Sequence, residues 1–350
     1  PKADAPSLDK EIKHNETEKW GVVGDNQIGD TVEFRTITTV PDTTEYTSYT
    51  YKIHDTMSAG LTSNVKNKDD IQIKIDDKNV LDGEYYSVEA EGNTFTVTVD
   101  IMKAVQKGVL KTANKLYTYY TGVLNSAAKI YDEGKQDNTA YLEYSNSPYD
   151  EGTGKTVDKK VYDWTFKMGV NKVDSTGNSL SGAKFVLSKE NGLKIDANKD
   201  GVPTNNKDKL IKLIANEDGT YTVAPSNYDG VTTYVITAGN VTIKGLDDSV
   251  DYYLYETAAP SGYNKLTDPV HFKITVDTKN YGTTGETKPT PTVTVGTSKA
   301  SEELSTNVVN TSGSLLPSTG GIGTTIFYVI GGILMVGAGV ILVSRRRRSK

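Results

Sequence analysis

Residues 166–172 read Phe-Lys-Met-Gly-Val-Asn-Lys, with apolar side chains at Phe166, Met168 and Val170. Side chains of a β-strand alternate between its two faces, so this period of two predicts a strand with one buried face. Lys172 lies an even number of residues from these apolar residues and so has the same strand parity, which means that its side chain is on their face. Lys172 is therefore expected to point into the core. A buried charge without a partner is costly, so a lysine at this place requires a chemical reason.

The same alternation recurs along most of the chain, between turns rich in Gly, Asn and Asp, and predicts an all-β protein with two tandem sandwiches. A short helix is expected near residues 102–107, ended by Gly108. The predicted strands of the first half are 31–37, 49–55, 71–75, 94–99, 116–120 and 140–144. Those of the second half are 165–173, 183–187, 220–223, 233–236, 251–256, 270–276 and 292–295.

The turn-rich run from Ser147 to Lys155 indicates where the two sandwiches meet. We therefore place the first sandwich at 8–148, a linker at 149–160 and the second sandwich at 161–312, flanked by segments 1–7 and 313–350. The chain begins at Pro1 without an initiator Met or an apolar leader, so we expect it to be part of a longer secreted chain.

Residues 313–350 have the composition of an anchoring segment. Residues 322–343 contain no charged side chain, and about 20 helical residues cross the hydrocarbon core of a bilayer. The basic run 345–348 marks the cytoplasmic end of this predicted transmembrane helix, which places the preceding residues outside the cell. Small residues within the span are common in membrane helices and do not by themselves indicate pairing.

Composition excludes several classes of function. The formal charge is -6, and without the basic tail the chain is more acidic still, which argues against nucleic acid as a partner. With three histidines and no cysteine, the chain has few residues that could form a catalytic triad. We therefore expect no enzyme active site and no cofactor. An exported chain without disulfides is expected to use another stabilising device.

A five-residue motif stands immediately before the span, formed by Leu316, Pro317, Ser318, Thr319 and Gly320. Together with the span and the arginines it resembles the cell-wall sorting signal of Gram-positive surface proteins. The resemblance implies a membrane-inserted precursor that a sortase cleaves between Thr319 and Gly320, joining Thr319 to an amine of the peptidoglycan or of another protein. The alternative is a tail-anchored protein that keeps its span.

In the second sandwich, Glu256 shares a strand face with Leu254, and Asn310 shares one with Val308, so a carboxyl and an amide are expected to face the core with Lys172. The segments around them resemble the collagen-adhesin B-type, immunoglobulin-like domains of sortase-assembled pili. The matching segments are Val170-Asn-Lys-Val-Asp174, Leu180–Leu187, the box Tyr255-Glu-Thr-Ala-Ala-Pro-Ser-Gly-Tyr263 and Asn307–Asn310.

The resemblance implies a spontaneous intramolecular isopeptide bond, with Lys172 as nucleophile, Asn310 as acceptor and Glu256 as proton shuttle. Burial would lower the lysine pKa and raise that of the glutamate, leaving a neutral amine and a protonated acid. The alternative is a buried ion pair between Lys172 and Glu256, with Asn310 capping a turn. Asn307 competes as acceptor but lies on the opposite strand face.

The first sandwich repeats this logic. Parity directs Lys10, Asp55 and Asn146 inward, while the alternative nucleophile Lys13 lies on the other strand face. The segments Pro6–Lys10, Ile28–Phe34, Tyr51–Asp55 and Leu142–Pro148 resemble the middle domain of backbone pilins. The resemblance implies a second bond from Lys10 to Asn146, with Asp55 as proton shuttle.

Pro1-Lys2 resembles the end of the pilin motif, whose lysine accepts the cleaved threonine of the next subunit, which makes Lys2 the expected acceptor; a solvated linker lysine is the alternative. Asp196, Asn198 and Asp200 match the start of a calcium loop, but Lys207 stands where its bidentate Glu is required, which favours a polar surface loop and no metal.

The chain is thus predicted to be a structural subunit of a covalently polymerised pilus on the cell surface. The partners implied are sortase, identical subunits and peptidoglycan, with a membrane only before sorting and no nucleic acid. Host surface ligands are a further class of partner. The rival interpretation is a wall-anchored adhesin, or a tip or base pilin, that does not polymerise.

Overall fold

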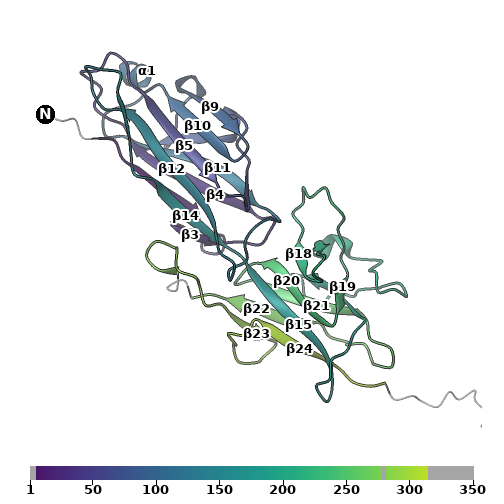
Figure 1. Cartoon of the computed structure of the whole chain (residues 1–350). Coiled ribbons are helices and arrows are strands. Elements are labelled where there is room, and N and C mark those ends of the chain that lie inside the picture. The colour runs from purple at the N-terminus through teal and green to yellow at the C-terminus, as the bar shows by residue number, and fades with distance from the viewer. Residues whose placement is uncertain (1–4, 278–280, 314–350) are drawn as a thin grey trace, which may run out of the picture.

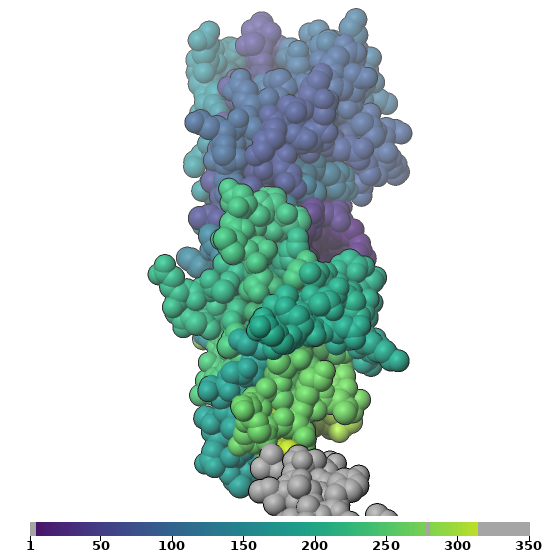
Figure 2. All heavy atoms as spheres, turned by 90° about the vertical axis from the view of Figure 1, so that its right-hand side faces the viewer, coloured from purple at the N-terminus to yellow at the C-terminus, as the bar shows by residue number. Residues whose placement is uncertain are grey.

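Alternation of buried and exposed side chains runs through the long strands of the computed structural model, which describes residues 5–277 and 281–313. In β11 (Lys115–Leu124) every second residue is buried, and β12 (Gln136–Ser145) follows the same rule over most of its length. The prediction of an all-β chain is confirmed, with two sandwiches arranged end to end along an elongated molecule (Figures 1 and 2).

The first sandwich contains two seven-stranded sheets. One has the order β2-β1-β4-β11-β7-β8, with β6 also paired to β11. Its other strands are β1 (Leu8–Lys13), β2 (Trp20–Gly21), β4 (Thr31–Thr39), β6 (Leu61–Ser63), β7 (Gln72–Ile75) and β8 (Asn79–Val80). The facing sheet has the order β3-β14-β12-β5-β10-β9, with β13 paired to β12. Its other strands are β3 (Val23–Asp25), β5 (Tyr51–Met57), β9 (Tyr86–Glu91), β10 (Thr94–Val99), β13 (Thr153–Lys155) and β14 (Lys159–Trp164).

The helix expected near residues 102–107 is present as α1 (Ile101–Gln106). The Asp100 side chain caps it by accepting a hydrogen bond from the Lys103 amide. Gly108 follows with a φ of 71°, a left-handed conformation that glycine adopts without strain. Three short 3₁₀ turns are η1 (Lys68–Asp70), η2 (Gly83–Tyr85) and η3 (Lys207–Lys209).

Strand pairing places the end of the first sandwich later than residue 148. The segment 149–160, predicted as a linker, contains β13 and the start of β14, and both strands pair with β12. β14 also runs parallel to β3, so it is an integral strand of the sheet. The Gly and Asp residues in this segment make a tight return within one sheet and do not separate two domains. We therefore propose a boundary at Thr165.

The second sandwich contains two five-stranded sheets. One has the order β17-β18-β20-β15-β24, from β15 (Phe166–Asp174), β17 (Leu213–Ala215), β18 (Tyr221–Val223), β20 (Asn240–Leu246) and β24 (Ser305–Asn310). The other has the order β19-β16-β21-β22-β23, from β16 (Ala183–Ser188), β19 (Ile236–Ala238), β21 (Asp251–Ala258), β22 (Val270–Thr275) and β23 (Thr292–Val295). The first and last strands of the second sandwich, β15 and β24, lie side by side and parallel.

Several strands of this sandwich differ from the prediction. Neither β17 nor β20 was predicted, and β20 pairs with β15 along most of its length. A strand was also predicted at 233–236, where regular pairing begins only at Ile236. Thr233 forms an isolated bridge with Leu213, and its hydroxyl accepts a hydrogen bond from the Val235 amide at 2.9 Å, so the pairing does not continue through residues 234 and 235.

The two sandwiches pack against each other without a spacer. The Ile28 amide of the first donates to the Gly245 carbonyl of the second at 3.0 Å, and the Ile28 side chain is 1% exposed. Gly245 is required there, because its φ is 85° and an added Cβ would lie 2.5 Å from Ile28 Cδ1. The Thr165 hydroxyl donates to the Leu246 carbonyl at 3.1 Å, which ties the connecting residue to the same contact.

Within residues 5–277 and 281–313, we find no helix with the length and apolar character needed to cross a bilayer. The span predicted at 322–343 lies outside the described residues.

Candidate cross-link sites in the two cores

Parallel pairing of β15 with β24 brings Lys172 and Asn310 to one face of a sheet. Lys172 is opposite Val308, and Asp174 is opposite Asn310, so Lys172 and Asn310 are diagonal neighbours. Both are 0% exposed, whereas Val309 between Val308 and Asn310 is 43% exposed. The inward direction of Lys172 and Asn310, predicted from parity, agrees with this burial.

Glu256 reaches the same place from β21 in the facing sheet and is 6% exposed. Its Oε2 accepts hydrogen bonds from Asn310 Nδ2 at 2.9 Å and from the Leu266 amide at 2.7 Å. Asn310 Nδ2 also donates to the Asn264 carbonyl at 2.5 Å. The structure therefore places the shuttle and acceptor candidates of the second sandwich in direct contact.

Two acceptor atoms of this cluster, Glu256 Oε1 and Asn310 Oδ1, have no hydrogen-bond donor in the structure. Buried acceptors without donors are unfavourable, because they lose their bonds to water.

Lys172 Nζ donates to two backbone carbonyls, those of Val308 at 2.6 Å and Val173 at 3.3 Å, and not to Glu256. Burial lowers the pKa of Lys172, and the negative charge of Glu256 only partly opposes this shift. A lowered pKa favours the neutral amine, which is the nucleophilic form of lysine. The contacts are therefore better suited to a nucleophile than to the alternative of a buried ion pair.

Asn307, the competing acceptor, is exposed on the other face of β24. Its Oδ1 accepts from Asn171 Nδ2 at 3.2 Å, outside the core. Asn307 is therefore not brought together with Lys172 and Glu256.

In the first sandwich, Lys10 and Asp55 meet in the core from opposite sheets, β1 and β5, with exposures of 4% and 1%. Lys10 Nζ lies 2.5 Å from Asp55 Oδ2. The hydroxyl of Tyr120 on β11 contacts both groups, accepting from Lys10 and donating to Asp55. Desolvation lowers the pKa of Lys10 and raises that of Asp55, while their mutual attraction opposes both shifts.

The alternative nucleophile Lys13 lies at the surface, where it forms ion pairs with Glu18 and with Glu33. It therefore lies outside the cluster of Lys10 and Asp55.

Asn146, the predicted acceptor, is not brought together with Lys10 and Asp55 in the structure. Asn146 follows the last residue of β12 and is exposed. Its backbone N–H donates to the Gly152 carbonyl at 3.2 Å in the turn to β13. In the pairing of β12 with β5, Asp55 is opposite Ala140. At about 3.3 Å per residue, Asn146 lies roughly 20 Å further along the strand.

Asn138 occupies the place predicted for Asn146. It is the diagonal neighbour of Asp55 on the inner face of β12 and is 0% exposed. Its Nδ2 donates to the Tyr120 hydroxyl at 3.4 Å, and its Oδ1 has no donor. Parity alone also directs Asn138 inward, because it is two residues before Ala140, so the strand register is the missing signal. Tyr120 was likewise missed, although it has the same parity as the buried residues Leu116 and Leu124 of β11.

The calcium-like loop uses its side chains to hold its own backbone. Asn198 Oδ1 accepts from the amides of Asp200 and Val202, both at 2.9 Å, and Asp196 Oδ2 accepts from Asn205 Nδ2 at 2.9 Å. These contacts favour the polar surface loop. Lys2 and residues 316–320, the predicted sortase acceptor and sorting motif, lie outside the described residues.

Comparison with known proteins adds two family matches. Residues 166–288 match a SpaA-type prealbumin-like fold domain, and residues 308–350 match the LPXTG cell wall anchor motif. A "Trypsin-resistant surface T6 protein" of Streptococcus pyogenes is 28% identical over 358 residues, which cover 87% of this chain and 62% of that protein. The chain thus spans about three fifths of the length of this curated relative.

Solved structures of pilins share the fold. The 35 kDa C-terminal fragment of a major pilin of Streptococcus agalactiae is 20% identical with a TM-score of 0.56, covering 88% of this chain and all of the fragment. The full-length major pilin RrgB of Streptococcus pneumoniae is 16% identical with a TM-score of 0.55, covering 89% of this chain and 75% of that one. The major pilin subunit BcpA of Bacillus cereus is 19% identical with a TM-score of 0.53, covering 89% and 71%.

The prealbumin-like domain, the anchor motif and the similarity to a streptococcal surface protein together support a sortase-assembled backbone pilin. The SpaA-type match begins at Phe166, the first residue of β15. The anchor match begins at Val308, within β24, so the strand that carries Asn310 continues directly into the anchor. The anchor motif places the chain outside the cell, on the cell wall, with a membrane-anchored precursor.

Proposed function

We propose that this pilin is a shaft subunit of a covalent pilus, in which a sortase joins Thr319 of one subunit to Lys2 of the next or to the cell wall. One observation carries the proposal. β24, which holds Asn310 beside Lys172, ends only a few residues before Leu316, so the strand next to the second buried lysine is also the strand that enters the sorting motif. The contact therefore lies where subunit tension would enter the domain.

We propose that Lys172 Nζ attacks Asn310 Cγ, forming a new C–N bond while the bond from Cγ to Nδ2 breaks. Glu256 takes a proton from the attacking amine and gives one to the leaving nitrogen, which departs as ammonia. Folding supplies the proximity, since well-oriented intramolecular groups reach effective molarities of about 10⁵ M or more. Each chain makes the bond once, so the reaction is self-modification and the pilin is a structural protein.

In the first sandwich the same chemistry is assigned to Lys10 as nucleophile, Asn138 as acceptor and Asp55 as proton shuttle. The support is that all three side chains are buried and that Tyr120 contacts each of them, directly by hydrogen bonds. The phenol orients the carboxyl and the amide around the amine.

These bonds define a path for tension along the subunit. Force entering at Lys2 reaches Lys10, crosses to Asn138, and follows β12, β13 and β14 to Lys172 before it crosses to Asn310 and Thr319. Tension therefore does not pass through the chain between Lys10 and Asn138 or between Lys172 and Asn310. The loops within these two stretches can vary without weakening the shaft.

Polymerisation is tested by replacing Lys2. Lys2→Ala is expected to abolish the ladder of covalent multimers in cell-wall extracts, because no amine would then accept Thr319 of the next subunit. Lys78→Ala, which removes an exposed lysine in a tight turn, is the matched control and should keep the ladder. A ladder that persists without Lys2 would place the acceptor elsewhere. The absence of any ladder from the unmodified chain would favour a wall-anchored adhesin or a tip or base pilin.

A further inference from the structure

The junction between the two sandwiches contains a cluster of four carboxylates, Glu16, Asp25, Asp247 and Asp248. Glu16 lies in the loop after β1 and Asp25 ends β3, whereas Asp247 and Asp248 follow β20 of the second sandwich. One oxygen of each carboxylate lies within 4.8 Å of an oxygen of every other. Asp25, Asp247 and Asp248 are 1%, 2% and 4% exposed, and Glu16 lies at the solvent edge.

Each buried carboxylate of this junction cluster has one oxygen held by a donor. Asp25 Oδ2 accepts from the Tyr281 hydroxyl at 2.7 Å, Asp247 Oδ2 from Asn15 Nδ2 at 2.7 Å, and Asp248 Oδ2 from the Val276 amide at 3.2 Å. In all three residues the other oxygen, Oδ1, is buried without a hydrogen-bond partner. The donors therefore orient the carboxylates and leave one acceptor of each unsatisfied.

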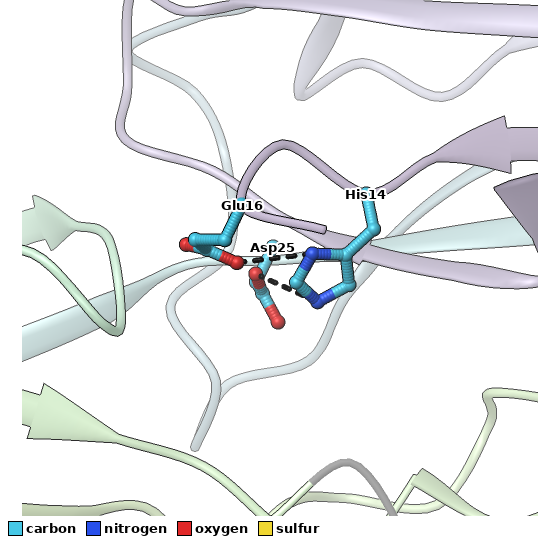
Figure 3. Close-up of side chains that lie close together, drawn as sticks. All are labelled: His14, Glu16 and Asp25. Atoms are coloured by element: carbon cyan, nitrogen blue, oxygen red, sulfur yellow. Dashed lines mark ion pairs between the residues drawn. The ribbon is translucent and has the colours of Figure 1, made fainter. Parts of the chain in front are cut away.

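One side chain supplies positive charge at this place (Figure 3). His14 contacts both Glu16 and Asp25, with Nδ1 3.0 Å from Glu16 Oε2 and Nε2 3.6 Å from Asp25 Oδ1. A single imidazolium does not balance four carboxylates, and among the residues described no lysine or arginine forms an ion pair with Asp247 or Asp248.

Buried carboxylates are normally paired with positive charge or coordinate a metal. Asp247 Oδ1 and Asp248 Oδ1 have no hydrogen-bond partner among the described residues.

We propose that the junction cluster is a binding site for a divalent cation of the calcium class, shared by the two sandwiches. Calcium binds oxygen ligands at about 2.3–2.6 Å, so two ligands of one ion are separated by at most about 5 Å, which the cluster satisfies. The four ligands are all carboxylates, which suits a hard cation. Magnesium fits less well, because it requires shorter, near-octahedral contacts and retains several waters. Glu16 at the solvent edge provides the entry.

The position of this site gives it a mechanical role. In the path for tension proposed above, residues 138–172 connect the sandwiches with no cross-link alongside them. A cation held by Asp25 from one side and by Asp247 and Asp248 from the other would clamp the junction in parallel with that segment. The binding itself does not depend on the proposed pilus function and is tested separately from it.

The test uses the full chain in detergent, with Tb³⁺ as a luminescent probe and Ca²⁺ as competitor. Tyr281 donates to Asp25 and lies beside Trp164, so bound Tb³⁺ is expected to emit when aromatic residues are excited, and Ca²⁺ should quench that emission. The double variant Asp247→Asn, Asp248→Asn should weaken Ca²⁺ binding by at least about tenfold, because ligand charge tunes calcium affinity.

Two matched controls locate the effect. Asp251→Asn removes an exposed carboxylate only a few residues away, and Asp196→Asn alters the calcium-like loop; both should bind as the parent does. The double variant should also have lost the rise in melting temperature that Ca²⁺ gives the parent relative to a chelator. Asp25→Asn provides the same comparison if the double variant does not fold.

The proposal is overturned if the parent binds neither ion, which would mean that protons alone neutralise the cluster. It is also overturned if binding survives in the double variant or disappears in Asp196→Asn.

Discussion

A Glu256→Gln variant is expected to lack the cross-link of the second sandwich and therefore to be heavier than the parent chain by one ammonia, roughly 17 Da. Glutamine keeps the volume of the side chain and an acceptor for the hydrogen bond from Asn310 Nδ2. It cannot take a proton from Lys172 or return one to the leaving nitrogen. The proposed bond should then fail although amine and amide remain side by side.

Loss of this bond should also lower stability strongly. A cross-link that closes a loop as long as 172–310 stabilises by roughly 4 to 5 kcal/mol if the entropy model for disulfides applies. For a domain of this size that corresponds to a fall in melting temperature on the order of 10 °C or more. Intact mass and calorimetry on the same sample measure both effects. Glu302→Gln, at an exposed glutamate between β23 and β24, is the matched control and should change neither.

Each unexpected mass would identify a different error. A variant with the mass deficit of the parent would show that Glu256 is not the proton shuttle. A parent chain with the full mass of its sequence would eliminate both bonds. The deficit expected for two bonds is roughly 34 Da.

The mass and stability of two asparagine variants are expected to identify the acceptor of the first sandwich. Asn138→Ala is expected to remove one ammonia of the mass deficit and a stabilisation of roughly 4 to 5 kcal/mol, because the loop 10–138 would no longer be closed. Asn146→Ala should keep both, because Asn146 is exposed beyond the end of β12. A peptide that joins Lys10 to Asn138 in a digest of the parent would identify the bond directly.

The opposite result would restore the assignment made from sequence. If Asn146→Ala loses the ammonia deficit and Asn138→Ala does not, the register of β12 against β5 differs from that described here. If neither variant changes the mass, Lys10 and Asp55 form only a buried ion pair, with Tyr120 bonded to both.

Strand parity was sufficient for most of the second site. It placed Lys172, Glu256 and Asn310 inward and Asn307 outward, and the burial of all four residues agrees. The direction of a side chain from a strand is a local property, set by the pleat of the backbone and the apolar pattern around it. That these residues touch also depends on the pairing of β15 with β24, for which the family resemblance was needed.

Parity was insufficient in the first site for a clear reason. Asn138 and Asn146 are separated by an even number of residues and therefore have the same parity, and only the pairing with the partner strand determines which of them is beside Asp55. That register is set by contacts between β5 and β12, which are distant in the chain. Composition was likewise insufficient for the segment 149–160, which was predicted as a linker, because a return within a sheet and a linker between domains have the same composition.

The sequence by itself determined the all-β class, the inward direction of both lysines and the anchor at the C-terminus, since each follows from local periodicity or from a contiguous motif. Only the tertiary structure decided the choice of Asn138, the end of the first sandwich at β14 and the carboxylate cluster at the junction. Glu16 and Asp25 belong to one sandwich, and Asp247 and Asp248 to the other. No local pattern brings them together, because their proximity is created by the packing of Ile28 against Gly245, where two folded domains meet.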